Sequence, residues 1–444
     1  MPTLVTQLFL GNLRDVPILK ICRLVCKSWN IEGTNSLRAC SKVYVAEGSA
    51  RLKYFTTLIL QKALGPLQHL PSPFQNFRVE SLKFTDPTFI EFAMKIRITN
   101  LKIVMDHVNA RQVISILASN KTSLKNLKIR IRNPNHFELD KYNINDPIEF
   151  TCLKWLAFDD SCDSCTHILF VEGILSRCKP EYLELSMKNE DAVSCLLTQD
   201  KAENLKKLKI QVSRISKEAL EHLGNLTFLG LSNLLFSVDH FVHEPGDLQQ
   251  WQLFCQNVSP LLEDFETNLP ISFAQELIFP NLKSIRIVDT IVWSYFTPDR
   301  FPSLEQVISQ FVGPLNIKAQ IEVPHRGVST LSIMIQESVI NENLEEGLSI
   351  ERIPRRKSIT DFVELETITF GLDFVMDPLM FRHCLPRVPK LRQINFYWNK
   401  SLSAPLLRDY LGHLERIVIC NRDDERFRVA MTQVAEMVPN SFMG

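Results

Sequence analysis

One short apolar phrase recurs along the chain and constrains the fold more than any other feature. It places an apolar residue first, a second apolar residue three positions later and a third two positions after that. The clear copies are VESLKF (79–84), ITNLKI (98–103), LKNLKI (124–129), LKWLAF (153–158), LKKLKI (205–210), LTFLGL (226–231), LKSIRI (282–287), LETITF (365–370), LRQINF (391–396) and LERIVI (414–419). The last two apolar residues of each copy lie two apart, so both point to the same face of a strand. With weaker copies included, about fourteen units recur about every 26 residues, and they must stack to bury their apolar edges.

The phrase and its spacing resemble the leucine-rich repeat over roughly residues 75–425. This resemblance implies an α/β solenoid in which parallel strands line the concave surface and helices form the convex surface. The segments 110–120 and 217–225 have helical spacing and suit the convex side. The alternative is a generic α/β domain whose strands happen to carry this pattern.

The first 45 residues do not follow the repeat and have helical spacing instead. In VPILKICRLVCKSWN (16–30), apolar residues recur at steps of four, three and four and share one helical face: Ile18, Cys22, Val25 and Trp29. Asp15 and Pro17 suit the first turn of a helix. We therefore expect one helix with an apolar stripe that runs from Ile18 to Trp29.

The stretch LVCKSW (24–29), which follows a short leucine-rich segment, resembles the F-box, a helical module that docks a cullin-RING ubiquitin ligase through a Skp-family adaptor. Phe9 and Leu10 fill the positions where the family has an Ile-Phe pair, and Leu13 fills that of the following leucine. Met1 and Pro2 stand where Leu-Pro is usual, whereas Leu4 replaces the customary acidic residue. The resemblance implies that the adaptor contacts Pro2, Leu8, Phe9, Leu10, Leu13, Val25 and Trp29.

The size of the N-terminal segment supports a docking role on physical grounds. A helical piece of about 40 residues holds little core, so some of its apolar side chains need a covering partner. That partner is either an adaptor or the first repeats, in which case the helices cap the solenoid and Trp29 joins the two parts. Both interpretations stay open at this point.

Cations recur at the position between the last two apolar residues of the repeats, which faces the concave surface. They are Lys83, Lys102, Lys128, Lys209 and Arg286. One interpretation is a basic strip that binds an acidic or phosphorylated protein target, and the other is ordinary solubilising lysines. Trp155 and Phe228 occupy neighbouring outward positions and are candidate binding anchors.

The amino-acid composition indicates which binding partners and which cellular compartment to expect for this protein. Lys and Arg together number 50, as do Asp and Glu, so no overall field favours nucleic acid or an anionic membrane. Eleven scattered cysteines in a long chain suit a reducing compartment, and we expect the cytoplasm, or the nucleus if RIPRRKS (352–358) acts in import. We find no signal peptide and no apolar run long enough to span a membrane.

We expect no enzyme, cofactor or metal. The chain has 14 glycines and no glycine-rich phosphate loop. The motif CDSCTH (162–167) offers Cys162, Cys165 and His167, with Cys152 and Cys178 in reach, but lacks the second close pair of a zinc site.

The sequence thus predicts an α/β chain in four parts. They are an F-box-like helical module (1–45), a bridging segment (46–75), an irregular leucine-rich-repeat solenoid (76–425) and a C-terminal capping helix (426–444).

Overall fold

The structure is a computed structural model of the 444-residue chain. It describes residues 3–13, 15–50, 52–54, 56–57, 76–81, 86–106, 109–131, 148–160, 177–188, 191–239, 245–269, 277–287, 297–311, 327–335, 364–370, 388, 390–397, 414–420 and 442–443. The chain divides into two compact units, Met1–Leu205 and Lys206–Gly444, which we describe in turn as unit 1 and unit 2.

Unit 1 begins with a helical module of α1 (Thr3–Asn12), α2 (Val16–Cys22) and α3 (Lys27–Cys40). The predicted helix start is confirmed, because the side chain of Asp15 accepts a 3.0 Å hydrogen bond from the amide of Ile18. The prediction of one continuous helix is wrong. Residues 23–26 form a turn, and Cys26 has an extended backbone at φ −162° and ψ 173°. The break turns α3 back against the other two helices, so Trp29 and Ile18 do not share a helical face.

The three helices enclose a small core. Leu10, Leu19 and Cys22 are buried, and partly buried apolar residues pack against them: Leu13, Trp29, Leu37 and Cys40. The rings of Phe9 and Trp29 lie 5.8 Å apart between α1 and α3. The module thus uses one face of each helix for its own core.

The sheet of unit 1 is parallel, and its strands pair in chain order. They are β1 (Lys42–Ala46), β2 (Asn76–Ser81), β3 (Ile98–Met105), β4 (Asn126–Ile131), β5 (Trp155–Asp160) and β6 (Tyr182–Met187). One buried residue from each strand forms a row through the register: Val45, Val79, Leu101, Leu127, Leu156 and Leu183. The sheet begins with β1, which spans the boundary predicted between the helical module (1–45) and the bridging segment (46–75).

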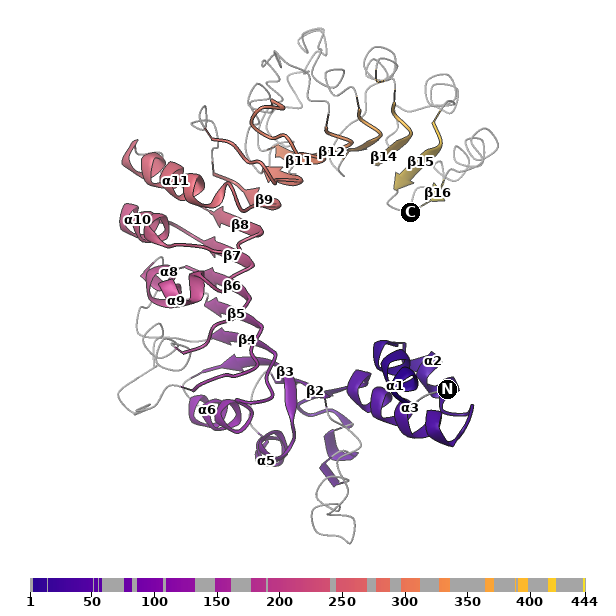
Figure 1. The fold of residues 1–444 in the computed structure, drawn as a ribbon. Helices are drawn as coiled ribbons and strands as arrows, with labels where there is room; N and C mark the ends of the chain where they lie inside the picture. The colour runs from indigo at the N-terminus through magenta and orange to yellow at the C-terminus, as the bar shows by residue number, and fades with distance from the viewer. Residues whose placement is uncertain are drawn as a thin grey trace. The chain divides into compact units, whose positions relative to one another are not determined.

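Helices cover one side of the sheet in unit 1 (Figure 1). They are α5 (Pro87–Lys95), α6 (Ala110–Ser119), α8 (Asp191–Leu196) and α9 (Gln199–Ala202). The predicted helix over 110–120 is confirmed by α6. We call the face of the β2–β6 sheet opposite α5 and α6 the open face.

Unit 2 repeats the same arrangement with parallel strands in chain order. Its strands are β7 (Lys207–Val212), β8 (Asn233–Val238), β9 (Asp264–Thr267), β10 (Ser284–Ile287), β11 (Gln306–Phe311), β12 (Thr330–Ile335), β13 (Thr367–Phe370), β14 (Gln393–Tyr397), β15 (Arg416–Cys420) and β16 (Phe442–Met443). Helices α10 (Lys217–Asn225) and α11 (Pro245–Val258) follow β7 and β8, and α10 matches the helix predicted over 217–225. Chain-order parallel pairing confirms a solenoid-like α/β fold. Of the predicted capping helix (426–444), residues 426–441 lie outside the described part, and Phe442–Met443 form a strand.

Two repeat copies are displaced from their predicted positions. Val79, and not Leu82, pairs with Leu101, so the first copy lies three residues earlier than predicted. The copy at 226–231 is not a strand, since β8 starts at Asn233 and buries Leu234 beside Leu208. The correct strand buries three alternating apolar residues, whereas Leu229 in the predicted copy is 66% exposed. Burial of a whole alternating face therefore decides the register.

Candidate functional site

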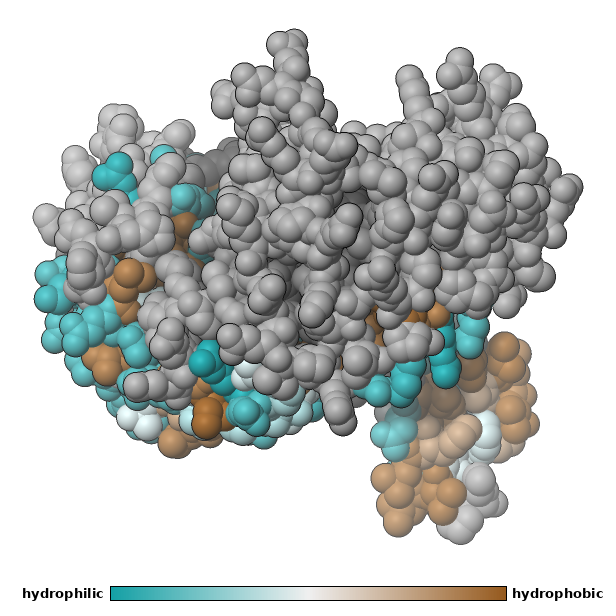
Figure 2. All heavy atoms as spheres, turned by 90° about the horizontal axis from the view of Figure 1, so that it is seen from above, coloured by the Kyte–Doolittle hydropathy of each residue, from teal (hydrophilic) through white to brown (hydrophobic). Residues whose placement is uncertain are grey.

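The helical module carries a broad exposed apolar surface, which we call the module surface. Its members are Leu4, Val5, Leu8, Phe9, Ile18, Ile21, Leu24 and Val25. On α1 the exposed side chains fall on adjacent helical positions, and the opposite side of the helix buries Thr6 and Leu10. Figure 2 shows apolar side chains, in brown, over much of the module that is in view. Leu24 reaches 85% exposure. Exposed apolar clusters of this kind mark interaction surfaces.

The residues predicted to contact an adaptor divide into two groups. Leu8, Phe9 and Val25 lie on the module surface. Leu10 is fully buried in the module core, so its predicted contact with a partner is corrected to a packing role. Leu13 and Trp29 are half-buried against the same core, and Pro2 lies outside the described residues. Five members of the module surface were not among the predicted contacts: Leu4, Val5, Ile18, Ile21 and Leu24. The spacing of the first two from Leu8 and Phe9 would have indicated them.

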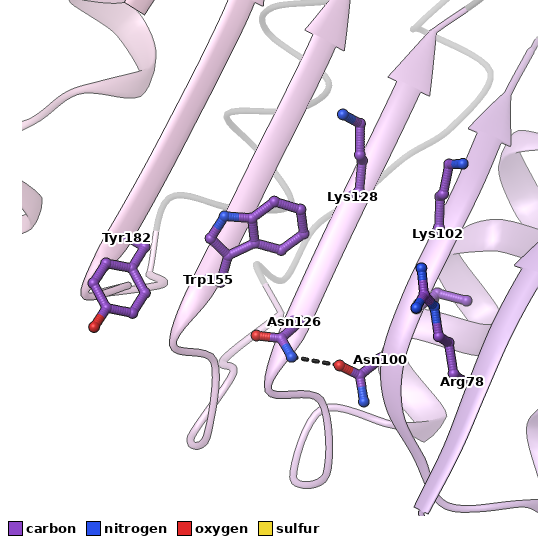
Figure 3. A pocket seen from close by; sticks show the side chains of 8 residues that line it. Arg78, Asn100, Lys102, Asn126, Lys128, Trp155 and Tyr182 are labelled. Carbon is purple, nitrogen blue, oxygen red and sulfur yellow. Dashed lines mark hydrogen bonds between the residues drawn. The ribbon is translucent and has the colours of Figure 1, made fainter. Parts of the chain in front are cut away.

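A second surface is a hollow of about 620 Å³ on the open face of unit 1 (Figure 3). It is lined by Arg78, Asn100, Leu101, Lys102, Asn126, Lys128, Trp155 and Tyr182. The parallel register creates it, because one residue from each of β2 to β6 falls in a single row: Arg78, Asn100, Asn126, Trp155 and Tyr182. Two positions further along their strands, Lys102 and Lys128 fall in the next row.

The cations of the hollow differ in their partners. Lys102 Nζ donates a 2.6 Å hydrogen bond to Glu80, and the Tyr44 hydroxyl donates to the same carboxylate at 2.8 Å. Both hydrogen bonds lower the pKa of Glu80, and the one from Lys102 has the larger effect. The guanidinium of Arg78 lies 5.8 Å from the centre of the Tyr44 ring. Within the described part of the chain, neither Arg78 nor Lys128 forms an ion pair.

The hollow therefore combines positive charge with amide and aromatic groups. Asn126 donates a hydrogen bond to Asn100 across the two strands, and this pair forms the edge of the hollow beside the cations (Figure 3). The ring of Trp155 is half-buried on the other side of Asn126, and Tyr182 follows on the next strand. Such a site suits an anionic group attached to an apolar one.

The predicted target-binding residues are only partly brought together. Lys102, Lys128 and Trp155 line the hollow, whereas Lys209 and Arg286 belong to unit 2, on β7 and β10. Arg286 pairs with Glu266 at 3.4 Å.

Phe228 is only 7% exposed and its ring lies 6.1 Å from that of Phe254 in α11, so its predicted role as a surface anchor is wrong. The cause is the displaced repeat copy at 226–231. Lys83 lies outside the described residues.

Besides the buried Leu101, the sequence analysis missed four residues of the hollow: Arg78, Asn100, Asn126 and Tyr182. The last three precede the central apolar residue of their strands, and the two-residue period of a strand places that position on the open face too. Arg78 was missed because the first copy was assigned three residues late.

The described residues hold no candidate metal centre. They contain no group of three or more His, Cys, Asp or Glu side chains that would hold a metal ion. Cys162, Cys165 and His167 lie outside the described part, while Cys178 is buried and Cys152 is exposed. Among the helices that the structure describes, none is long and apolar enough to cross a membrane.

Comparison with known proteins adds no family assignment. No protein-family model matches the chain, and no curated protein matches its sequence.

Proposed function

We propose that this chain is the substrate-recognition subunit of a Skp–cullin–F-box ubiquitin ligase in the cytoplasm or nucleus. In this proposal the helical module is an F-box and the parallel strands belong to leucine-rich repeats. The observation that carries it is the module surface, which exposes Leu24 and Val25 of the F-box-like LVCKSW stretch. A three-helix module with its own core and a second apolar surface is suited to docking another protein.

The proposed protein catalyses no step itself. The module surface binds a Skp-family adaptor, and the open face of the sheet binds a target protein. Holding both at once raises the effective concentration of the target near the ubiquitin-charged enzyme. Rate enhancement then comes from proximity and needs no catalytic side chain in this chain.

Paired aspartate substitutions on the module surface test this function. Leu8 is 58% exposed and Val25 is 62% exposed, so Leu8→Asp and Val25→Asp place a charge in the docking surface without entering the module core. We expect the double variant to lose at least about 100-fold in affinity for a purified Skp-family adaptor, because each charge would be buried without a partner. Biolayer interferometry measures the affinity, and circular dichroism checks the fold.

Leu229→Asp is the matched control, since Leu229 is 66% exposed but belongs to unit 2. It should bind the adaptor within about twofold of the wild type. Absence of measurable adaptor binding by the wild-type chain would overturn the proposal.

The rival function is an interaction scaffold with no ligase role, in which the helices cap the sheet. One contact favours it: α3 runs directly into β1 and also contacts β2. This rival predicts that the aspartate pair leaves every partner interaction unchanged.

A further inference from the structure

We infer that the hollow on the open face of unit 1 binds a phosphorylated peptide, with the phosphate among Arg78, Lys102 and Lys128 and an adjacent apolar side chain on Trp155. The inference deepens the proposed function and rests on it in one respect: the peptide is taken to be a segment of the target protein.

Charge complementarity points to a single strong anion. Three cations converge on the hollow, and Lys102 alone among them is paired, with Glu80 at 2.6 Å. Among the described residues Arg78 and Lys128 form no ion pair, although Arg78 is close enough to Glu80 to interact with its charge. The three cations and the single carboxylate of Glu80 therefore leave an excess of about two positive charges. A phosphate monoester carries up to two negative charges at neutral pH and matches this excess.

The hydrogen-bond donors of the hollow, a guanidinium and two ammonium groups, also suit a phosphate group. A guanidinium presents parallel N–H groups that fit two phosphate oxygens at once, and an ammonium supplies a point charge to the third. Arg78 and Lys128 come from β2 and β4, and Lys102 comes from β3, the strand between these two (Figure 3). The anion would thus be contacted by donors from three neighbouring strands.

Acidic groups at the border of the hollow limit the length of the anion. Asp159 pairs with Arg130 at 2.8 Å in the row beyond Lys128, and Glu184 follows Tyr182 on β6. A chain of phosphates, as in a nucleic acid, would meet these carboxylates after the first phosphate. The balance of charge over the entire protein points the same way.

The aromatic side of the hollow supplies the second element of recognition. The Trp155 ring is directed toward the strand that carries Lys128 (Figure 3). Trp155 lies on the strand next to that of Lys128 and pairs with Asn126, two residues before Lys128. This short distance means that an apolar side chain one or two positions from the phosphorylated residue of a peptide reaches the indole. From β2 to β6 the row spans about 19 Å, which is about six residues of extended peptide.

Selection from peptide libraries tests the inference with the full-length protein alone. Nine-residue libraries carry a central phosphoserine, phosphothreonine or phosphotyrosine, with degenerate flanks, beside unphosphorylated and glutamate counterparts. We expect phosphorylated peptides with an apolar residue within two positions of the phosphate to be enriched. For the best peptide, fluorescence polarisation should show at least tenfold weaker binding without the phosphate.

Point variants locate the binding. Arg78→Ala and Lys128→Ala should each weaken the best peptide about tenfold, and Trp155→Ala should do the same for peptides with the apolar residue. Arg111→Ala is the matched control, because Arg111 is exposed on α6. This substitution removes the same charge as Arg78→Ala, but on the other side of the sheet. It should bind within twofold of the wild type.

Three results would overturn the inference. They are equal enrichment of phosphorylated and unphosphorylated peptides, equal binding of the glutamate form, and a loss for Arg111→Ala as large as that for Arg78→Ala. Because no adaptor is present in this assay, a negative result leaves the proposed adaptor docking intact. Failure of adaptor docking likewise leaves phosphopeptide binding measurable.

Discussion

Burial separates cysteines that composition alone treats alike. Cys178 and Cys255 are buried, whereas Cys26 and Cys152 are exposed. Burial raises the pKa of the Cys178 thiol to about 11, and it also raises that of Cys255. Because the thiolate is the reactive form, both buried thiols are protected chemically as well as sterically.

Alkylation by iodoacetamide at about pH 8, followed by peptide mass spectrometry, should show this protection. We expect Cys178 in the folded protein to react at least about 100-fold more slowly than in urea, because a pKa about two units higher leaves about 100-fold less thiolate. Its rate should keep rising about tenfold per pH unit to about pH 10, above the range where an unfolded thiol levels off. Cys152 serves as the exposed control. Equal native rates for Cys178 and Cys152 would contradict the structure.

Secondary-structure elements of unit 1 are joined by buried polar groups as well as by apolar packing. Asn120 is 1% exposed at the end of α6. Its side-chain oxygen accepts from the amide of Ile98 at 2.8 Å, and its nitrogen donates to the carbonyls of Ala93 and Ile116 at 3.1 Å. One amide therefore links α5, α6 and β3 below the open face.

Replacing this amide should destabilise unit 1. Asn120→Ala leaves the Ile98 amide and the Ala93 carbonyl buried without partners, at a cost of about 3 kcal/mol. We expect the melting temperature, followed by scanning calorimetry, to fall by about 5 °C or more. Asn225→Ala is the control, since Asn225 is exposed at the end of α10, and it should change stability by no more than about 0.5 kcal/mol. Equal melting temperatures for the two variants would show that the Asn120 hydrogen bonds contribute no stability.

Across the entire chain, the two candidate surfaces use different side chains. The module surface is drawn from α1, α2 and the turn after α2, and the hollow from β2 to β6. The two sets share no residue. A receptor that must hold a target while it is docked to its ligase benefits from such separation.

Binding at the two surfaces should therefore be independent. We expect a saturating Skp-family adaptor to change the affinity of the best phosphopeptide by less than about twofold, as ligands with no shared contacts have little coupling free energy. Isothermal titration calorimetry with and without the adaptor measures this coupling. A change of more than about fivefold would show that the surfaces communicate.

Most strand positions follow directly from local sequence. Four residues predicted as the central apolar residue of a repeat copy are buried in the sheet: Leu101, Leu127, Leu156 and Leu183. They were predictable because the alternation of apolar residues along a strand is visible in the strand's own sequence. The helices α6 and α10 were likewise predictable from their own spacing. The exposed residues Leu8, Phe9 and Val25 were singled out by family resemblance, and their exposure agrees with a docking role.

Other features depend on contacts between distant segments. Leu229 and Leu234 both satisfy the local pattern, and only pairing with β7 and burial beside Leu208 selects Leu234. The turn at residues 23–26 separates α2 from α3, and Trp29 of α3 packs against Phe9 of α1, a contact that the spacing within residues 16–30 does not indicate. The hollow exists because parallel register sets side chains from Arg78 to Tyr182 in one row, although about a hundred residues of chain separate them. Local periodicity therefore predicts which segments become strands and helices, whereas long-range pairing energy decides their register and hence which side chains meet.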